Sequence, residues 1–489
     1  MAQSVEGMEN IFKMPTGCFE QTSSGLYPDV MVLKYMEDNE IINDKLKKKA
    51  LSYISAGYQR ILTFEVPGVK GGYSLYGDTP ANPSLTAYGL MELTDLSKVY
   101  EIDSKVTENM KNYLFKQQKS NGSFNIGSTY YSNHVIQKTD DLTLNAYIIW
   151  ALSEADSKDT RLEKSINYLE NNIDKMTDSY TKALAANAFA NVGNTKNAKL
   201  LIDKLLEKMV NDNNTYYLKS DIVDCYGSRG NVQDLQTTAL TSIALSKTDT
   251  NYKANSNLIN TIISRKDSYG TWGTTQATIL SLKALVEFKE KSDISNQTVN
   301  LNINDKNMSF DIKEDSLEIY EIYCQDMPTE NHLSINMDKG KLYYEIIEEY
   351  NEEIAKYKEK NQNKINVTYT LKNNIKVNDK VIQTINIKNE SGASIQNGMV
   401  EITIPQGFKV QEELLSKLVT EKKIQKYEYN YSKIYLYLQD TAIDEELKLD
   451  IGYRASYPGK ITGGQVRVYD YYNPDVEGMA MPIEININK

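Results

Sequence analysis

Helical windows with small residues at their centres recur along the first 292 residues, and this recurrence restricts the fold more than any other feature of the chain. Apolar residues in these windows follow helical spacing, and glycine-aromatic turns precede several of them. The repeat, with a period of roughly 40–60 residues, is typical of arrays of helix pairs. Because each pair can bury its apolar face only against its neighbours, the pattern predicts a ring of helix pairs. The windows lie at 84–93, 143–148, 182–186, 237–240 and 275–280.

Helical spacing gives way to alternation at about residue 293. Segments 299–303 and 308–312 alternate apolar and polar residues, which predicts half-buried strands within residues 293–350. A run of charged residues follows, and we interpret residues 351–362 as a solvated linker.

Alternating segments resume after the charged run and continue to the C-terminus, as at 365–369 and 400–404. One amphipathic helix is expected to interrupt them near 411–418. Residues 363–489 are therefore predicted to form a β-sandwich with one inserted helix. The whole chain is predicted to be a multidomain α + β protein.

A thiol and a carboxamide lie three residues apart near the start of the chain, at Cys18 and Gln21. Across one turn of backbone, the Cys18 sulfur could attack the side-chain carbonyl of Gln21 and expel ammonia. The product would be an internal thioester, an acyl group on a good leaving group that an external amine or hydroxyl can attack. The alternative is a buried cysteine followed by solvent-facing polar residues.

The segment Gly17-Cys18-Phe19-Glu20-Gln21 resembles the G-C-G-E-Q thioester motif of the α2-macroglobulin and complement thioester-protein family. A Met-Pro pair precedes the motif in that family, as Met14-Pro15 does here. One residue departs from the motif: Phe19 replaces the second glycine, so a positive φ at that position would be costly. Further segments similar to the family, in its order, lie at 57–60, 71–74, 85–88 and 468–472.

The resemblance implies a domain plan. Residues 1–292 would be the family's thioester domain, an α/α toroid, and residues 293–350 the second half of a CUB domain. Residues 363–489 would be the receptor-binding domain, a macroglobulin-like β-sandwich. Neither the first half of the CUB domain nor upstream macroglobulin domains are recognisable, and no secretory signal is seen. We therefore expect a C-terminal portion of a larger exported protein, extracellular or in the periplasm or cell envelope.

The resemblance also implies a function: a thioester-bearing portion of an α2-macroglobulin-like protease inhibitor. The thioester would acylate lysine amines or hydroxyls of a target, so that proteases or other proteins and surfaces are captured covalently. This is a single-use reaction and not the turnover of an enzyme. Partners would include the upstream macroglobulin domains of the full-length protein.

Five further residues are candidates for roles at the site, and the roles of four of them are implied by the resemblance. In the family the receptor-binding domain shields the thioester from water, and Tyr469, Tyr471 and Tyr472 are the matching aromatic residues here, unless they simply fill a sandwich core. In complement-like members a histidine forms an acyl-imidazole, and His134 lies close to the matching location, although an isolated loop histidine is usually only surface. Glu20 could orient Gln21 or could simply face solvent.

Composition excludes several classes of protein. A net charge of −11, spread along the chain, argues against a nucleic-acid partner. Three cysteines cannot form a dense disulfide framework, and no apolar run approaches the roughly 18–20 residues of a membrane span. We found no metal-ligand spacing and no phosphate loop or dinucleotide motif, so we expect neither a metal nor a cofactor.

The sequence leaves three alternative functions open. A complement-like role, tagging surfaces instead of proteases, is the nearest and depends on His134. An α/α-toroid enzyme would need an acidic cluster at the ring mouth, for which only the pair Asp140-Asp141 is a candidate; a Cys18/His134 hydrolase is another form of this idea. A passive adhesion module would contain no reactive bond.

Overall fold

The structure of the protein is a computed structural model with two compact units. Unit 1 comprises residues 1–131, 140–220 and 233–348, and unit 2 comprises residues 132–139, 221–232 and 349–489. His134, Tyr472, Cys225 and the charged segment 351–362 lie outside the residues that the structure describes. The described residues are 12, 14–15, 17–38, 44–126, 139–224, 228–266, 271–288, 297–304, 306–312, 322, 324, 328, 330–337, 364–395, 398–439, 441–471 and 473–489.

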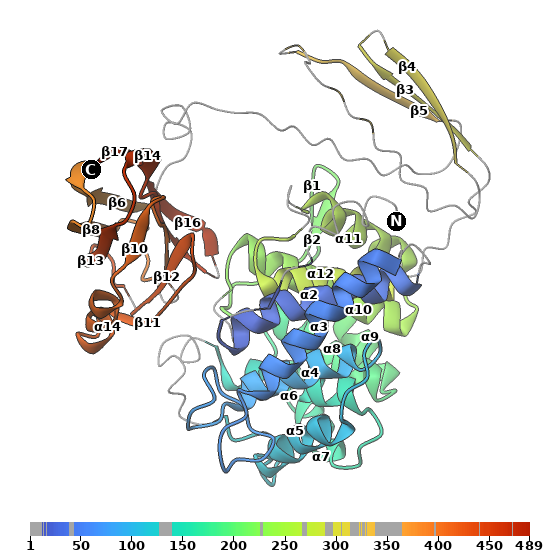
Figure 1. Cartoon of the computed structure of the whole chain (residues 1–489). Coiled ribbons are helices and arrows are strands. Elements are labelled where there is room, and N and C mark those ends of the chain that lie inside the picture. The colour runs from blue at the N-terminus through green and yellow to red at the C-terminus, as the bar shows by residue number, and fades with distance from the viewer. Residues whose placement is uncertain are drawn as a thin grey trace. The chain divides into compact units, whose positions relative to one another are not determined.

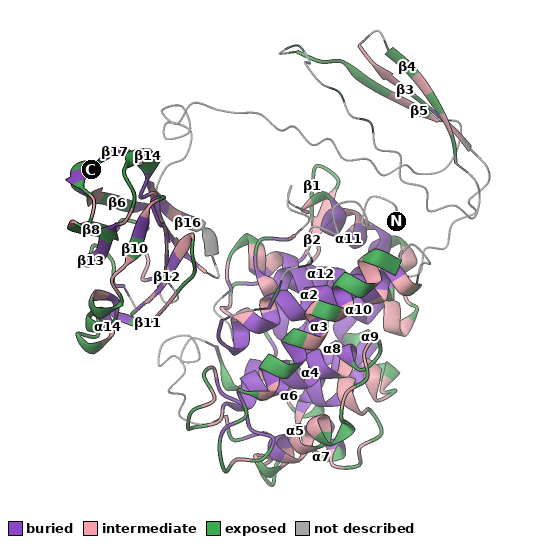
Figure 2. Ribbon diagram, viewed as in Figure 1, coloured by how far each residue is buried: buried purple, intermediate pink, exposed green. Residues whose placement is uncertain are grey.

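Helices that are buried on nearly all sides alternate with helices that bury one face (Figures 1 and 2). The buried ones are α2 (Phe19–Asp38), α4 (Pro83–Leu96), α6 (Asp141–Ala155), α8 (Ser179–Asn191), α10 (Asn231–Thr248) and α12 (Thr275–Glu287). The half-exposed ones are α3 (Asp44–Leu62), α5 (Ser104–Lys116), α7 (Leu162–Glu170), α9 (Thr195–Leu206) and α11 (Tyr252–Ser264), with the 3-10 turn η2 (Ile173–Lys175) after α7. Small residues such as the four buried alanines of α8 let the buried helices approach one another closely.

Side-chain caps fix where the buried helices begin. Asn82 accepts a hydrogen bond from the Leu85 N–H at 3.0 Å, and Pro83 follows it at the first helical position, where its missing N–H is harmless. Asp140 caps α6 through the Thr143 N–H at 2.9 Å.

The first and last buried helices of unit 1 are neighbours. α4 packs against α6, α6 against α8, and α2 against both α4 and α12. A short antiparallel hairpin, β1 (Val210–Asp212) and β2 (Thr215–Tyr217), interrupts the helices, and the sequence pattern had not predicted it. After the helices, β3 (Gln297–Ile303), β4 (Lys306–Ile312) and β5 (Leu333–Met337) form an antiparallel sheet in the order β4-β3-β5.

The described residues of unit 2 form three sheets. A four-stranded sheet has the order β10-β13-β8-β6, a five-stranded one β11-β12-β9-β15-β16, and a three-stranded one β14-β17-β7. The helix expected near 411–418 is present as α14 (Glu412–Thr420). The strands are β6 (Ile365–Thr370), β7 (Asn374–Lys376), β8 (Lys380–Asn389), β9 (Gly398–Thr403), β10 (Phe408–Val410), β11 (Ile424–Tyr429), β12 (Lys433–Leu438), β13 (Glu446–Ala455), β14 (Gly459–Gly463), β15 (Val466–Asp470), β16 (Asn473–Ala480) and β17 (Ile483–Asn488).

One hydrophobic core joins the sheets of unit 2. Ile385 and Ile451 enter it from the four-stranded sheet, Val400 and Val468 from the five-stranded sheet, and Leu415 from α14. The alternation of buried and exposed residues along β8 and β12 is the period of two that the sequence shows. The chain is thus a mixed helix and sheet protein: all of its described helices except α14 lie before residue 288, and its larger sheets lie after residue 364.

Candidate functional site

Cys18 and Gln21 meet at the start of α2. Cys18 is 4% exposed and directly precedes the helix, and its backbone N–H donates a hydrogen bond to Gln21 Oε1 at 3.2 Å. This contact polarises the carboxamide carbonyl and places it over the turn that carries the thiol. Gln21 here is the encoded glutamine, so its carbonyl stands for the acyl group of a thioester. An N–H aimed at that oxygen would also stabilise the negative charge that develops when the carbonyl carbon is attacked.

Gly17 provides the space in which the carboxamide lies. Its φ of +85° is accessible chiefly to glycine. A Cβ at this position would lie 2.8 Å from Gln21 Cβ and 2.9 Å from Gln21 Cδ, closer than side-chain atoms pack. Both the backbone conformation and the packing therefore require glycine before the cysteine.

Arg60, near the C-terminal end of α3, holds the turn from outside. Its Nε donates to the Gly17 carbonyl at 2.9 Å and to Thr22 Oγ1 at 3.1 Å, and its Nη2 also donates to the Gly17 carbonyl. The Thr22 hydroxyl donates to the same carbonyl at 3.3 Å. The guanidinium lies 5.7 Å from the centre of the Phe64 ring. A guanidinium is thus fixed on the carbonyl of the residue that precedes Cys18.

Phe19 replaces the family's glycine without strain. It is the first residue of α2, its φ is not positive, and its side chain is fully buried. Its ring meets Phe64, Tyr73 and Tyr88 edge-on, with centroids 5.8, 6.0 and 6.2 Å away. The space for it comes from Gly89, where a Cβ would lie 2.8 Å from Phe19 Cζ. The first residue of α2 is therefore packed among buried aromatic rings.

Two features complete the first turn of α2. The Phe19 N–H donates to the Leu75 carbonyl at 2.9 Å, which ties the turn to the 63–82 loop. Glu20 is only 8% exposed, so the interpretation that it faces solvent is wrong. A carboxylate in the first turn is also favoured by the helix dipole.

Tyr469 lies on the outward face of β15 in unit 2. Val466 and Val468 point into the core, whereas Arg467 and Tyr469 alternate onto the other face, with the guanidinium 4.6 Å from the centre of the tyrosine ring. Partial burial raises the pKa of Tyr469 to about 12. The interpretation that Tyr469 fills a sandwich core is therefore wrong. Tyr471, just after the strand, is partly buried.

An ion pair next to these tyrosines was not anticipated from the sequence. Arg229 Nη2 lies 2.9 Å from Asp470 Oδ2, and both residues belong to unit 2. The segment that carries Arg229 is fixed in turn by Asp224, which accepts from the Ser228 N–H at 2.8 Å, and by the Thr139 hydroxyl, which donates to the Asp224 carbonyl at 3.0 Å.

Charged side chains lie buried among the helices of unit 1. Lys283 Nζ is 2.6 Å from Asp95 Oδ2, which also accepts from the Tyr27 hydroxyl at 2.5 Å. Burial alone would raise the pKa of Asp95, but the ammonium of Lys283 holds it below its usual value. Glu154 and Lys247 form a second partly buried pair. In these two pairs each charge has an opposite charge beside it, which offsets the cost of its desolvation.

Glu92 has no cation beside it. Its carboxyl accepts from the Ser23 hydroxyl at 2.6 Å, and burial raises its pKa to about 8, although the hydrogen bond from Ser23 opposes the shift. At neutral pH the folded protein therefore keeps this acid protonated.

A Glu92→Gln variant is expected to lose part of the pH dependence of stability. Between the ordinary pKa of 4.5 and about 8, the unfolded chain releases this proton while the folded chain keeps it, so stability falls as pH rises and the decline ends above the folded pKa. The total change in unfolding free energy is roughly 5 kcal/mol. Urea unfolding at several values between about pH 5 and about pH 8 measures it. The control is the exposed Glu163→Gln, which should keep the native dependence of unfolding free energy on pH. The same dependence in Glu92→Gln would contradict the raised pKa of Glu92.

The acidic pair proposed for a toroid enzyme has another use. Asp140 caps α6, accepting from the Thr143 N–H at 2.9 Å and from its hydroxyl at 2.8 Å, and Asp141 is the first residue of that helix. Within the described part of the chain, no group of three or more potential metal ligands comes together. None of the described helices is long and apolar enough to cross a bilayer.

Comparisons with known proteins cover almost the whole chain. Residues 1–288 match the family described as the A-macroglobulin TED domain, and residues 393–482 match the A-macroglobulin receptor binding domain. The chain is 22% identical to thioester-containing protein 1 of Anopheles gambiae, alleles S3 and S1, over 501 residues; the alignment covers 98% of this chain and 35% of the relative. The chain therefore spans about a third of the length of these relatives.

Solved structures of bacterial proteins share the fold. The α2-macroglobulin of Escherichia coli, from domain MG7 to the C-terminus, superposes with a TM-score of 0.68 at 15% identity, covering 99% of this chain and 75% of that one. Salmonella α2-macroglobulin reacted with methylamine gives a TM-score of 0.69 at 16% identity, covering 100% of this chain and 31% of that one.

Proposed function

This chain belongs to the A-macroglobulin thioester-domain family, and from that premise we propose that it is the covalent-capture portion of an α2-macroglobulin-like protease inhibitor. The observation that carries the proposal is the hydrogen bond of 3.2 Å from the Cys18 N–H to Gln21 Oε1. It holds a carboxamide carbonyl on the turn that bears the thiol. A single-use acylation follows from this arrangement, because the acyl group is part of the chain itself.

The proposed chemistry has two steps. First, the Cys18 sulfur attacks Gln21 Cδ, the oxyanion on Oε1 is held by the Cys18 N–H, and ammonia leaves. Second, a lysine amine of the target attacks the same carbon, the Cys18 thiolate leaves, and an amide joins the target to the side chain at position 21. Arg60 stabilises the thiolate that departs, and Glu20 is proposed to orient the carboxamide.

The surroundings supply the protection that a thioester needs from water. The buried aromatic contacts of Phe19 shield one side of the turn from water. We infer that Tyr469, Tyr471 and Tyr472 cover it from above in the full-length protein, as receptor-domain residues; the outward position of Tyr469 on β15 supports this. His134 is proposed to accept the acyl group in transfers to hydroxyls, which would extend the reaction to surface tagging.

The wider architecture is part of the proposal. The neighbouring positions of α2 and α12 support a closed α/α toroid, the shared core of unit 2 supports a macroglobulin-like sandwich, and the β3–β5 sheet is inferred to be the second half of a CUB domain. We propose an exported protein, extracellular or in the cell envelope, whose upstream macroglobulin domains sense the protease.

Intact mass with and without methylamine tests the thioester. The native chain should be lighter than the encoded one by one ammonia, and Cys18 should resist alkylation. Methylamine should then add at position 21 and release the thiol; the Salmonella relative is described as reacted with the same amine. Cys18→Ala is the control, with the encoded mass and no addition. An encoded mass in the native chain, with Gln21 an amide and Cys18 freely alkylated, would contradict the proposal.

A further inference from the structure

A basic pocket lies on unit 1, where the 66–72 loop meets α5. Its volume is about 460 Å³, within the range of roughly 300–1,000 Å³ that is usual for small-molecule sites. No carboxylate is among its described lining residues, although the chain carries a net charge of −11. The lining consists of three cations, two carboxamides and one aromatic ring: Lys70, Lys116, Arg161, Asn109, Asn112 and Phe115.

The loop side of the pocket is fixed by a close backbone approach. Gly71 has a φ of +79°, and a Cβ there would lie 2.8 Å from the Met110 nitrogen, so only glycine lets the loop lie directly on α5. The Gly71 N–H donates to Glu65 Oε1 at 2.6 Å, which locks this approach. Lys70 therefore projects from a rigid position beside Asn109.

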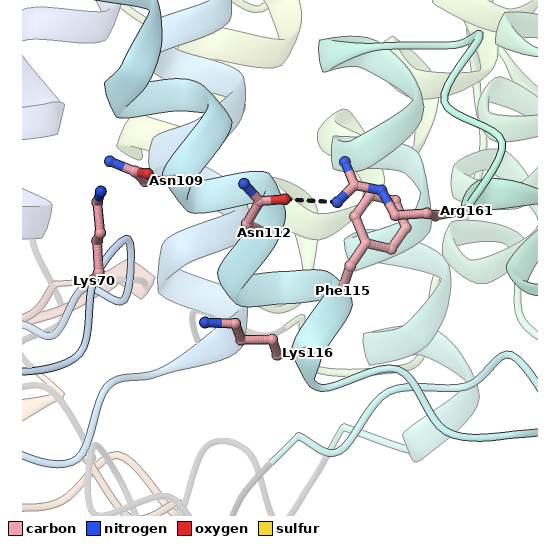
Figure 3. Close-up of a pocket in the computed structure, with 6 residues that line it drawn as sticks. All are labelled: Lys70, Asn109, Asn112, Phe115, Lys116 and Arg161. Atoms are coloured by element: carbon pink, nitrogen blue, oxygen red, sulfur yellow. Dashed lines mark hydrogen bonds between the residues drawn. The ribbon is translucent and has the colours of Figure 1, made fainter.

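The opposite wall is equally rigid. Arg161 Nε donates to both oxygens of Asp159, at 2.9 and 3.1 Å, and its guanidinium stacks 4.2 Å from the centre of the Phe115 ring (Figure 3). Its Nη1 donates to Asn112 Oδ1 at 2.6 Å. This bond directs Asn112 Oδ1 toward the guanidinium and leaves both side-chain N–H groups of Asn112 available to a ligand.

Two ammonium groups of the pocket are left without a counter-charge. Lys70 and Lys116 have no ion-pair or hydrogen-bond partner in the described part of the chain. The nearby acids are already held by other cations: Asp159 by Arg161, and both Glu108 and Asp156 by Lys111, at 2.8 and 3.2 Å. The pocket therefore offers two ammonium groups with no partner among the described residues, beside the carboxamides of Asn109 and Asn112.

We propose that this pocket binds a phosphorylated saccharide. The phosphate would bind the ammonium groups of Lys70 and Lys116, since lysine binds phosphate as a point charge. The sugar hydroxyls would accept hydrogen bonds from the N–H groups of the two carboxamides. A free phosphate ion would leave most of the 460 Å³ unfilled. An acidic peptide fits less well, because a cavity of about 460 Å³ is sized for a small molecule.

Isothermal titration calorimetry with glucose 6-phosphate tests the site. The double variant Lys70→Gln/Lys116→Gln should bind at least about tenfold more weakly than the native chain, since two charge-assisted contacts are lost. The matched control is Lys105→Gln/Lys119→Gln, which removes the same charge from exposed positions outside the pocket. Its affinity should be unchanged. Glucose and inorganic phosphate should each bind more weakly than glucose 6-phosphate.

Four outcomes would overturn the proposal. The native chain fails to bind glucose 6-phosphate, or the two double variants lose affinity equally, which would indicate charge alone. Inorganic phosphate binds as tightly as the sugar phosphate, which would leave only an anion site. A hexaglutamate peptide binds more tightly than glucose 6-phosphate, which would make the pocket a peptide site. None of these results depends on whether the thioester forms.

Discussion

A Gly17→Ala variant is expected to fold but to carry almost no thioester. The added Cβ would lie 2.9 Å from Gln21 Cδ, so the carboxamide must move away from the turn that holds Cys18. Displacing a reacting group by about 1 Å costs on the order of 10²-fold in rate. Intact mass should equal the encoded value, Cys18 should be alkylated without methylamine treatment, and methylamine should add nothing.

Gly68→Ala is the matched control for this variant. Gly68 has nearly the same φ, +81°, but a Cβ there would meet no atom within 4 Å. It should therefore lose about 1 kcal/mol of stability from the strained backbone and keep its thioester. A normal thioester in Gly17→Ala would show that the carboxamide does not depend on the space above this glycine.

A Lys283→Met variant is expected to cost about 3 kcal/mol of unfolding free energy. Lys283 is 6% exposed and lies 2.6 Å from Asp95, whose carboxylate would remain buried after the ammonium is removed. Breaking such a pair from one side typically costs about 3–5 kcal/mol, and the lower figure applies because Tyr27 still donates to Asp95. Urea unfolding at neutral pH measures the loss.

Lys98→Met separates the buried pair from its exposed neighbour. Lys98 lies 2.7 Å from the other oxygen of Asp95, but its side chain is 46% exposed. Its removal should cost under about 1 kcal/mol. Equal losses in the two variants would mean that burial does not determine the strength of this network.

Local patterns predicted much of this protein. The contact between Cys18 and Gln21 follows from their spacing of three, because residues that far apart share a face of the first helical turn. The buried helices followed from their small-residue windows and the strands from alternation. The outward position of Tyr469 could also have been predicted, since Val466 and Val468 alternate with it along β15.

Contacts between distant parts of the chain left no such signal. Arg60 reaches Gly17 across 43 positions, and Arg229 reaches Asp470 across 241. Both depend on how elements pack, and spacing in the sequence carries no information about that. Phe19 illustrates the same point: the ring's place depends on Gly89, which no local pattern connects with it.

The hydrogen bonds that reach the reactive turn from Arg60 and Leu75 have a consequence for the order of events during synthesis. The turn is complete only when residues 17–22, Arg60 and Leu75 are all in place. A nascent chain that has not yet emerged past residue 75 lacks part of this clamp. In the proposed chemistry, closure of the thioester is therefore expected to follow the packing of these segments, so that the presence of the bond would report that the N-terminal helices have folded.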